Sequence, residues 1–241
     1  MISFTSQTMS DTRDYPQPEA KEWLHTIAKA ATAAIPVAGG PAAELLAAII
    51  VPPVTKRRDE WFAELGQRVA ELAAKLDEFR PENLTSNEAF VSSVLAATQI
   101  AMKTTQKEKR EALLGAVLNS ASRNAPDEDD RQIFLQLIDE LTGWHLRVLR
   151  VLSTPRQYCD QNGVRYEPAL SSSRHGLLTH CFPELKPRED FLSQIMIDLK
   201  ARGLSGTADL KTMMSTTGAF EKATTRRGDE FLRFITEPTT E

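Results

Sequence analysis

Apolar residues recur every three or four positions along much of the chain, and this spacing predicts helices that each carry one apolar stripe. The clearest stripe lies between Arg57 and Arg80, and Pro81 follows where the helix would have to end. Its members are Phe62, Leu65, Val69, Leu72, Leu76 and Phe79. An earlier helix is predicted from Pro18, with a stripe of Trp23, Leu24, Ile27 and Ala31. The polar residues 1–17 before it predict a flexible arm.

Further helical stripes follow Pro81 and are separated by turn signals. Thr85, with Glu88 three residues later, has the capping-box pattern and predicts a helix start. Apolar stripes then lie at 90–102, 113–118, 133–141 and 144–152, and the second is compatible with a continuation of the first. Turn signals at 124–127 and at 142–143 delimit the last two stripes. Residues 18–153 are therefore predicted to form a multi-helix bundle.

Residues 24–53 of this bundle are predicted to form a hydrophobic hairpin, because Glu44 is the only ionisable residue between positions 30 and 53. Its turn comprises Pro36, Gly39, Gly40 and Pro41, and its second helix is expected to run from Pro41 to Val51 and to end at Pro52-Pro53. Each half measures about 16–24 Å at 1.5 Å per residue, less than a hydrocarbon core of about 30 Å. Two interpretations stay open: a packed centre of the bundle, or a hairpin that enters lipid when it is released.

The C-terminal part has a different pattern. Residues 154–170 are irregular and polar, which predicts a linker. Short helices are predicted at 171–181 and 187–202, with Gly203 as a C-terminal stop. A small β-hairpin is expected at 204–223, followed by a helix capped by Thr225. The fold class predicted for the whole chain is mainly α, with an α+β module at 171–241.

This C-terminal order of elements resembles a winged-helix domain. The resemblance is carried by Asp198-Leu199, leading into Arg202-Gly203-Leu204, and by the Thr-x-x-Gly-x-x-Phe-Leu pattern at 225–232. In winged helices that bind DNA, the second helix of the motif enters the major groove. The resemblance thus implies a nucleic-acid surface at Arg188, Lys200, Arg202, Lys222, Arg226 and Arg227. The helix at 187–202 also carries three acids, which favours contacts with protein over contacts with DNA.

The N-terminal half looks like the bacterial abortive-infection proteins of the alpha type. The turn Ile-Pro-Val-x-Gly-Gly-Pro and the run 56–61, Lys-Arg-Arg-Asp-Glu-Trp, carry this resemblance. Proteins of that type join a hydrophobic helical region rich in small residues to a later helical or winged part. The resemblance implies a role in bacterial antiviral defence and transfers no active-site residue.

Composition and charge narrow the function classes. The 241 residues are 41% hydrophobic and 26% charged, as in an ordinary globular protein. The net charge of −4 provides no general attraction to nucleic acid. Two cysteines, Cys159 and Cys181, form no disulfide framework and favour a reducing cytoplasm. A cytoplasmic location is expected, peripheral to the inner membrane if the hairpin contacts lipid.

No catalytic, cofactor or metal motif stands out. Gly39-Gly40 lacks the Lys and Ser/Thr of a phosphate loop, and no Gly-x-Ser-x-Gly occurs. Cys159, His175, His180 and Cys181 do not have the spacing of a structural zinc site. The acids at 127–130 suit a helix N-terminus better than a calcium loop.

A basic patch is the remaining candidate for contact with an anion or a partner. It comprises Lys56, Arg57, Arg58, Lys103, Lys107 and Arg110. The last three would share one face if 103–110 were continuous helix.

The sequence thus favours a non-enzymatic protein-interaction module, an effector or accessory protein in abortive-infection-like defence. The alternatives are a winged-helix DNA-binding regulator and a conditional membrane-disrupting protein acting through residues 30–53.

Overall fold

The computed structural model describes residues 41–167 and 171–238, and these residues are mainly helical, as predicted. The α-helices are α2 (Pro41–Ala73), α3 (Pro81–Thr85), α4 (Glu88–Lys103), α5 (Lys107–Ala121), α6 (Glu128–Glu140), α7 (Gly143–Ser153), α8 (Pro155–Gln161), α9 (Arg174–Cys181), α10 (Glu189–Ala201), α11 (Thr216–Ala219) and α12 (Arg226–Ile235). Two 3-10 helices, η1 (Asp77–Phe79) and η2 (Pro183–Leu185), complete them. Within the described ranges, no helix is both long and apolar enough to span a bilayer.

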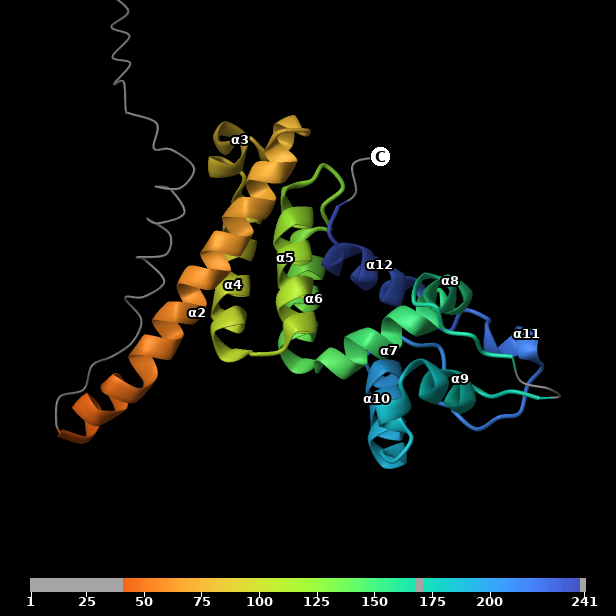
Figure 1. Ribbon diagram of the computed structural model, residues 1–241. Coiled ribbons are helices and arrows are strands. Elements are labelled where there is room, and N and C mark those ends of the chain that lie inside the picture. The colour runs from red at the N-terminus through yellow and green to blue at the C-terminus, as the bar shows by residue number, and fades with distance from the viewer. Residues whose placement is uncertain (1–40, 168–170, 239–241) are drawn as a thin grey trace, which may run out of the picture.

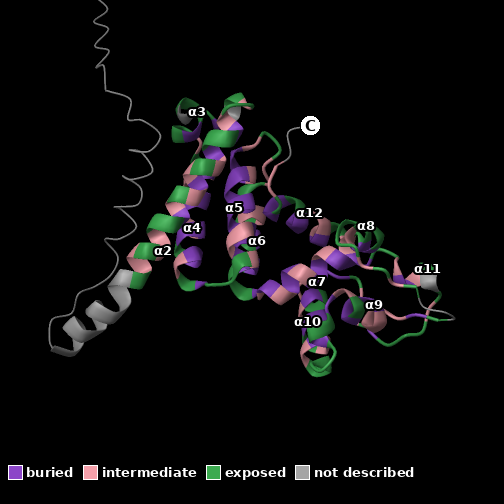
Figure 2. Cartoon of the chain, in the orientation of Figure 1, coloured by how far each residue is buried: buried purple, intermediate pink, exposed green. Residues whose placement is uncertain are grey.

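Helices α2, α4, α5 and α6 pack side by side and form the first half of the molecule (Figure 1). Leu65, Val69 and Leu72 of the predicted stripe are buried, and α2 packs against α4. Phe62 of the stripe is only half-buried, whereas Trp61, which the predicted stripe did not include, is fully buried. Helix α5 lies at the centre, and most of its residues from Ala112 to Ala121 are buried (Figure 2). A helix surrounded on several sides cannot show a single apolar stripe, which explains the mixed pattern at 112–121.

Helix α2 corrects the prediction for the second half of the hairpin. It continues through Pro52-Pro53 to Ala73 as one helix of 33 residues. Prolines lack the amide proton, so the carbonyls of Ala48 and Ile49 lose their usual donors at these two positions. The helix nevertheless continues, and its N-terminal turns extend past the end of α4 (Figure 1). The turn residues Pro36, Gly39 and Gly40 lie outside the described residues, whereas Pro41 begins α2 and Glu44 lies in its first turn.

Three further boundaries differ from the prediction. Helix α2 ends at Ala73 rather than at Arg80, and Phe79 reaches the core from η1. The cap of α4 is Asn87, whose side chain accepts a hydrogen bond from the amide of Phe90, so the capping box expected at Thr85 is wrong. Residues 104–106 separate α4 from α5, which excludes a continuous helix there.

Several predicted helix ends are confirmed. Asp127 caps α6 by accepting from the amide of Asp130, and Thr225 caps α12 by accepting from the amide of Gly228. Thr142 begins α7 as a capping box with His145. Gly203 follows α10 with φ +69°, a left-handed conformation that suits glycine.

The C-terminal part contains more helix and less β-structure than predicted. Helix α8 forms at 155–161, where an irregular linker was expected. No strand forms in residues 204–223, so the prediction of a β-hairpin there is wrong. The described chain has only two isolated antiparallel bridges, Ser172 with Met214 and Ser205 with Thr224. A hairpin needs register-fixing turn residues and alternating apolar positions, and this threonine-rich stretch instead contains α11.

Helix α12 joins the C-terminal part to the bundle by packing against α5 and α7. Asn119 on α5 binds the C-terminal end of α12, because its side-chain amide donates to the carbonyls of Phe234 (2.8 Å) and Thr236 (2.6 Å). Phe134 contacts the rings of Phe231 and Phe234, both at 5.6 Å between centroids. The N-terminal ends of α5, α7 and α10 are brought to one region of the surface, described next.

Candidate functional site

The basic residues predicted as an anion or partner patch are distributed over three helices, α2, α4 and α5, and most of them have internal partners. Those of α2 each find an internal partner: Lys56 with Glu60 (3.8 Å), Arg58 with Asp59 (2.9 Å) and Arg57 with the carbonyl oxygen of Met102 (3.2 Å). Lys103, at the C-terminal end of α4, lies 3.7 Å from Asp139. Because α4 ends there, Lys103 does not share a helix face with Lys107 and Arg110, and that part of the prediction is wrong.

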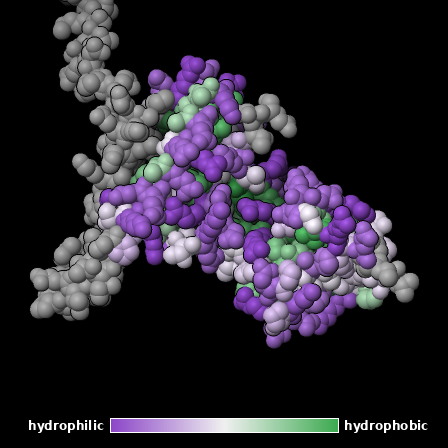
Figure 3. Space-filling view, in the orientation of Figure 1, coloured by the Kyte–Doolittle hydropathy of each residue, from purple (hydrophilic) through white to green (hydrophobic). Residues whose placement is uncertain are grey.

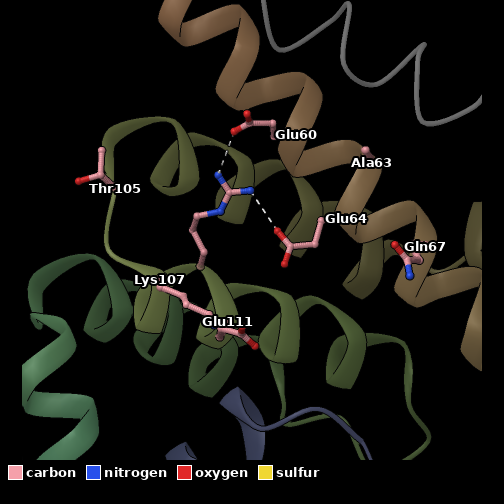
Figure 4. Close-up of a pocket in the computed structure, with 8 residues that line it drawn as sticks. Glu60, Ala63, Glu64, Gln67, Thr105, Lys107 and Glu111 are labelled. Carbon is pink, nitrogen blue, oxygen red and sulfur yellow. Dashed lines mark hydrogen bonds and ion pairs between the residues drawn. The ribbon is translucent and has the colours of Figure 1, made fainter.

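Lys107 and Arg110 line an open groove between α2 and α5, with a volume of about 560 Å³. The groove also includes Glu60, Ala63, Glu64, Gln67, Thr105 and Glu111. Arg110 forms ion pairs with two acids of α2, at 3.0 Å with Glu64 and 4.0 Å with Glu60. Both acids are labelled in Figure 4. Three carboxylates against two cations leave a net charge of −1, so this groove does not attract an anion.

A second cavity, of about 420 Å³, lies where the N-terminal ends of α5, α7 and α10 meet. We call it the arginine–aromatic pocket. It is lined by Gln106, Glu108, Thr142, Gly143, Trp144, Arg147, Arg188 and Phe191. Figure 3 shows that one face of the molecule is mostly hydrophilic. The pocket differs from such a surface because it combines two aromatic rings with two cations.

Both arginines of the pocket stack on aromatic rings. The guanidinium carbon of Arg147 lies 4.1 Å from the ring centroid of Trp144 and 4.6 Å from that of Phe182. Arg188 lies 3.9 Å above Phe191. Such contacts contribute about 0.5–2 kcal/mol each and hold the guanidinium in place. Within the described residues neither arginine forms an ion pair or donates a side-chain hydrogen bond, so the N–H edges of both are available to a ligand.

One side of the pocket is formed where the first turn of α5 approaches the first turn of α7. The amide of Gly143 donates to the side-chain oxygen of Gln106 (2.6 Å). A Cβ atom at Gly143 would lie 2.9 Å from a carboxylate oxygen of Glu108. Gly143 thus lies against the first turn of α5, and the Glu108 carboxylate would have to move to accommodate a Cβ atom there.

His145 of α7 contacts Asp198 of α10. Its Nδ1 accepts from the amide of Thr142 (3.2 Å), which assigns the proton of the neutral ring to Nε2, 3.3 Å from Asp198. Burial lowers the pKa of His145 more than Asp198 raises it, and Arg202 and Lys109 lower it further. At neutral pH the imidazole is thus neutral, and it links α7 to α10 through Asp198.

We expect the free energy of unfolding to decrease as the pH falls below about 6.5, the ordinary pKa of histidine. In that range the unfolded chain binds a proton at position 145 that the folded state, with its lowered pKa, does not take up. Urea unfolding of wild type and of His145→Gln at neutral and mildly acidic pH isolates this contribution, because the two proteins differ only at position 145. A parallel pH dependence in the two proteins would contradict the assignment.

The residues predicted to contact nucleic acid do not form a free cationic surface. Four of the six are engaged with carboxylates: Arg202 with Glu140 and Asp198, Lys222 with Asp229, Arg226 with Glu230, and Arg227 with Asp130. Arg188 belongs to the arginine–aromatic pocket, and Lys200 is exposed on α10. A phosphate backbone would have to compete with these internal acids.

The two cysteines come together in the fold. Their sulfur atoms lie 3.8 Å apart, between α8 and α9, and both thiols are free. Burial raises the pKa of both, that of Cys181 to about 12, so both are protonated thiols near neutral pH. Across the described part of the chain, no group of three or more His, Cys, Asp or Glu residues is placed to hold a metal ion.

Sequence reasoning found Arg188 but missed the rest of the pocket. Trp144 was assigned to an apolar stripe, and neither Arg147 nor Phe191 had a predicted role in a site. The signal that was available is the i, i+3 spacing of an aromatic residue and an arginine, at 144 and 147 and, in reverse order, at 188 and 191. No family model, curated protein or solved structure matches the chain, so the function is argued from this geometry.

Proposed function

We propose that the chain is a non-enzymatic protein-interaction module and that the arginine–aromatic pocket is its contact surface. The observation that carries this proposal is the pair of stacked guanidinium groups, Arg147 and Arg188, that have no carboxylate partner among the described residues. Tryptophan and arginine are the residues most enriched where protein interfaces concentrate their binding energy. Both are present here in a half-buried cavity of ligand size, within the range of about 300–1,000 Å³.

The pocket chemistry favours binding over bond making. A guanidinium remains protonated at neutral pH and does not exchange protons with a substrate. Glu108 is the one carboxylate among the lining residues, and Gln106, Thr142 and the aromatic rings are not bases. Stacking also restricts the arginine side chains before binding, which reduces the entropy lost when a partner docks.

For the C-terminal part, we propose a winged-helix-like arrangement of α9, α10 and α12 in which a loop takes the position of the wing. Support comes from the base of that loop, where the Gly206 amide donates to the carbonyl of Ala223 (2.8 Å) and the Thr225 amide to that of Leu204 (3.1 Å). Ion pairs on the basic residues of this unit favour protein contacts over DNA contacts, as argued above.

We further propose that the module acts in the bacterial cytoplasm as an effector or accessory protein of abortive-infection-like defence. The resemblance of the 36–61 region to the alpha type supports this role. The cytoplasm is supported by the low cysteine content, because Cys159 and Cys181 are the only cysteines of the chain.

The proposal predicts that reversing the charge of the pocket abolishes partner binding. Tagged protein is cross-linked in the cells that encode it, and the partner is quantified by mass spectrometry. With Arg147→Glu/Arg188→Glu, we expect recovery of the specific partner to fall by at least about tenfold, since a buried charge contact at an interface is worth 2–5 kcal/mol.

The matched control is Arg150→Glu/Lys186→Glu, which makes the same charge change one helical turn from Arg147 and two residues before Arg188, outside the pocket lining. Equal recovery of the partner by both double variants would refute the pocket as the contact surface. Phage plating on cells carrying each variant tests the defence role. Protection by the control and none by the pocket variant is expected, and equal plating on all strains would remove the defence assignment.

A further inference from the structure

The arginine–aromatic pocket has features that select the chemistry of its ligand. The faces of both guanidinium groups are covered by rings, at 4.1 Å for Arg147 over Trp144 and 3.9 Å for Arg188 over Phe191. Stacking leaves the planar N–H edges exposed. Those edges match a carboxylate, which accepts two parallel hydrogen bonds from one guanidinium.

We propose that the pocket binds an acidic side chain, Asp or Glu, that is flanked by an apolar residue in a segment of a protein partner. This inference rests on the proposed function and specifies the partner segment. The apolar neighbour is required by Trp144 and Phe191, which are half-buried and face the same cavity as the two cations. Removing such ring surface from water contributes about 25 cal/mol per Å².

The net charge of the pocket favours a single negative charge. Glu108 lies among the lining residues with Arg147 and Arg188, so two positive charges and one negative charge leave +1. A side-chain carboxylate balances this charge. A phosphate, which carries about −1.5 to −2 at neutral pH, would leave an excess of negative charge beside Glu108.

The backbone also disfavours a phosphate. Phosphate sites at helix N-termini use free amide groups, whereas three amides at the start of α7 are already engaged. The amide of Thr142 donates to His145 Nδ1, that of Gly143 to Gln106, and that of His145 to the carbonyl of Thr142. At the α7 end of the pocket, recognition therefore falls to side chains rather than to these three amides.

The test measures the binding of short end-blocked fluorescent peptides to the full chain by anisotropy. One peptide alternates Glu with Leu, and in two matched peptides Gln or phosphoserine replaces Glu. We expect the Glu peptide to bind at least about tenfold more tightly than either, and inorganic phosphate to compete poorly. Equal binding of the Gln peptide would overturn the carboxylate assignment. Tighter binding of the phosphoserine peptide would make the site a phosphate site.

Lysine substitutions test the forked geometry. Arg147→Lys and Arg188→Lys keep the charge and lose the bidentate edge, so each should reduce the affinity for the Glu peptide about tenfold. Arg150→Lys should leave the affinity for this peptide unchanged. Arg188 is exposed, so its variant tests the proposal even where Arg147→Lys alters folding, which thermal melting reports. Unchanged affinity in Arg188→Lys would overturn the proposal. If the peptides do not bind but cellular partner recovery still depends on Arg147 and Arg188, the ligand class is wrong and the proposed function stands.

Discussion

Replacing Trp61 by alanine is expected to lower the free energy of unfolding by about 3–5 kcal/mol, the cost of deleting a large buried aromatic side chain. Trp61 is fully buried where α2 packs against α4. Its Nε1 donates to the hydroxyl of Thr98 at 3.0 Å, so the variant loses a buried hydrogen bond as well as packing. Urea denaturation followed by circular dichroism measures the change.

Trp61→Phe is the matched control, because it keeps an aromatic ring in the core while it removes the indole donor and a smaller part of the ring system. Thr98 still donates to the carbonyl of Val94 (2.6 Å), so its hydroxyl does not lose its only partner. A loss of about 1 kcal/mol is expected for this variant. If alanine at position 61 costs less than about 1 kcal/mol, α2 is not anchored to the bundle through this side chain.

The helical class of the fold could be predicted because apolar spacing records which side of a helix meets the core. Leu65, Val69 and Leu72 recur at that spacing and are all buried. Local capping chemistry was equally readable at Asp127, Thr142 and Thr225, since each side chain acts within three residues of itself. Agreement was therefore best where a few neighbouring residues determine the structure.

Prediction failed where distant residues or competing local signals determine the structure. Pro52-Pro53 disfavours a helix locally, yet α2 continues through it. At the start of α4, Thr85 and Asn87 both have capping side chains, but Thr85 is the last residue of α3, and Asn87 caps α4. The candidate site was the hardest part to predict. Arg147 and Arg188 are 41 positions apart in sequence and share a pocket only because α7 packs against α10.

The contact between α5 and α12 shows the same dependence on distant chain segments. Gly115 of α5 lies against the last turn of α12, and a Cβ atom there would be 2.3 Å from the carbonyl oxygen of Ile235 and 2.5 Å from its carbonyl carbon. Both are backbone atoms, so rotation of a side chain cannot relieve the overlap. The helices would have to separate, and Asn119 would then lose its bonds to the carbonyls of Phe234 and Thr236.

Gly115→Ala is therefore expected to lower the free energy of unfolding by about 1–3 kcal/mol, as overpacking does in a tight core. The sign is diagnostic, because the same substitution in an unobstructed helix would raise stability by up to about 1 kcal/mol. Gly206→Ala is the control, since its Cβ atom would make an ordinary contact at 3.7 Å and should change stability by less than about 0.5 kcal/mol. Hydrogen exchange of the α12 amides should accelerate in Gly115→Ala alone. A stabilised Gly115→Ala protein with unchanged exchange would mean that α12 does not pack closely on α5, and the link between the bundle and the pocket-bearing C-terminal helices would have to be redrawn.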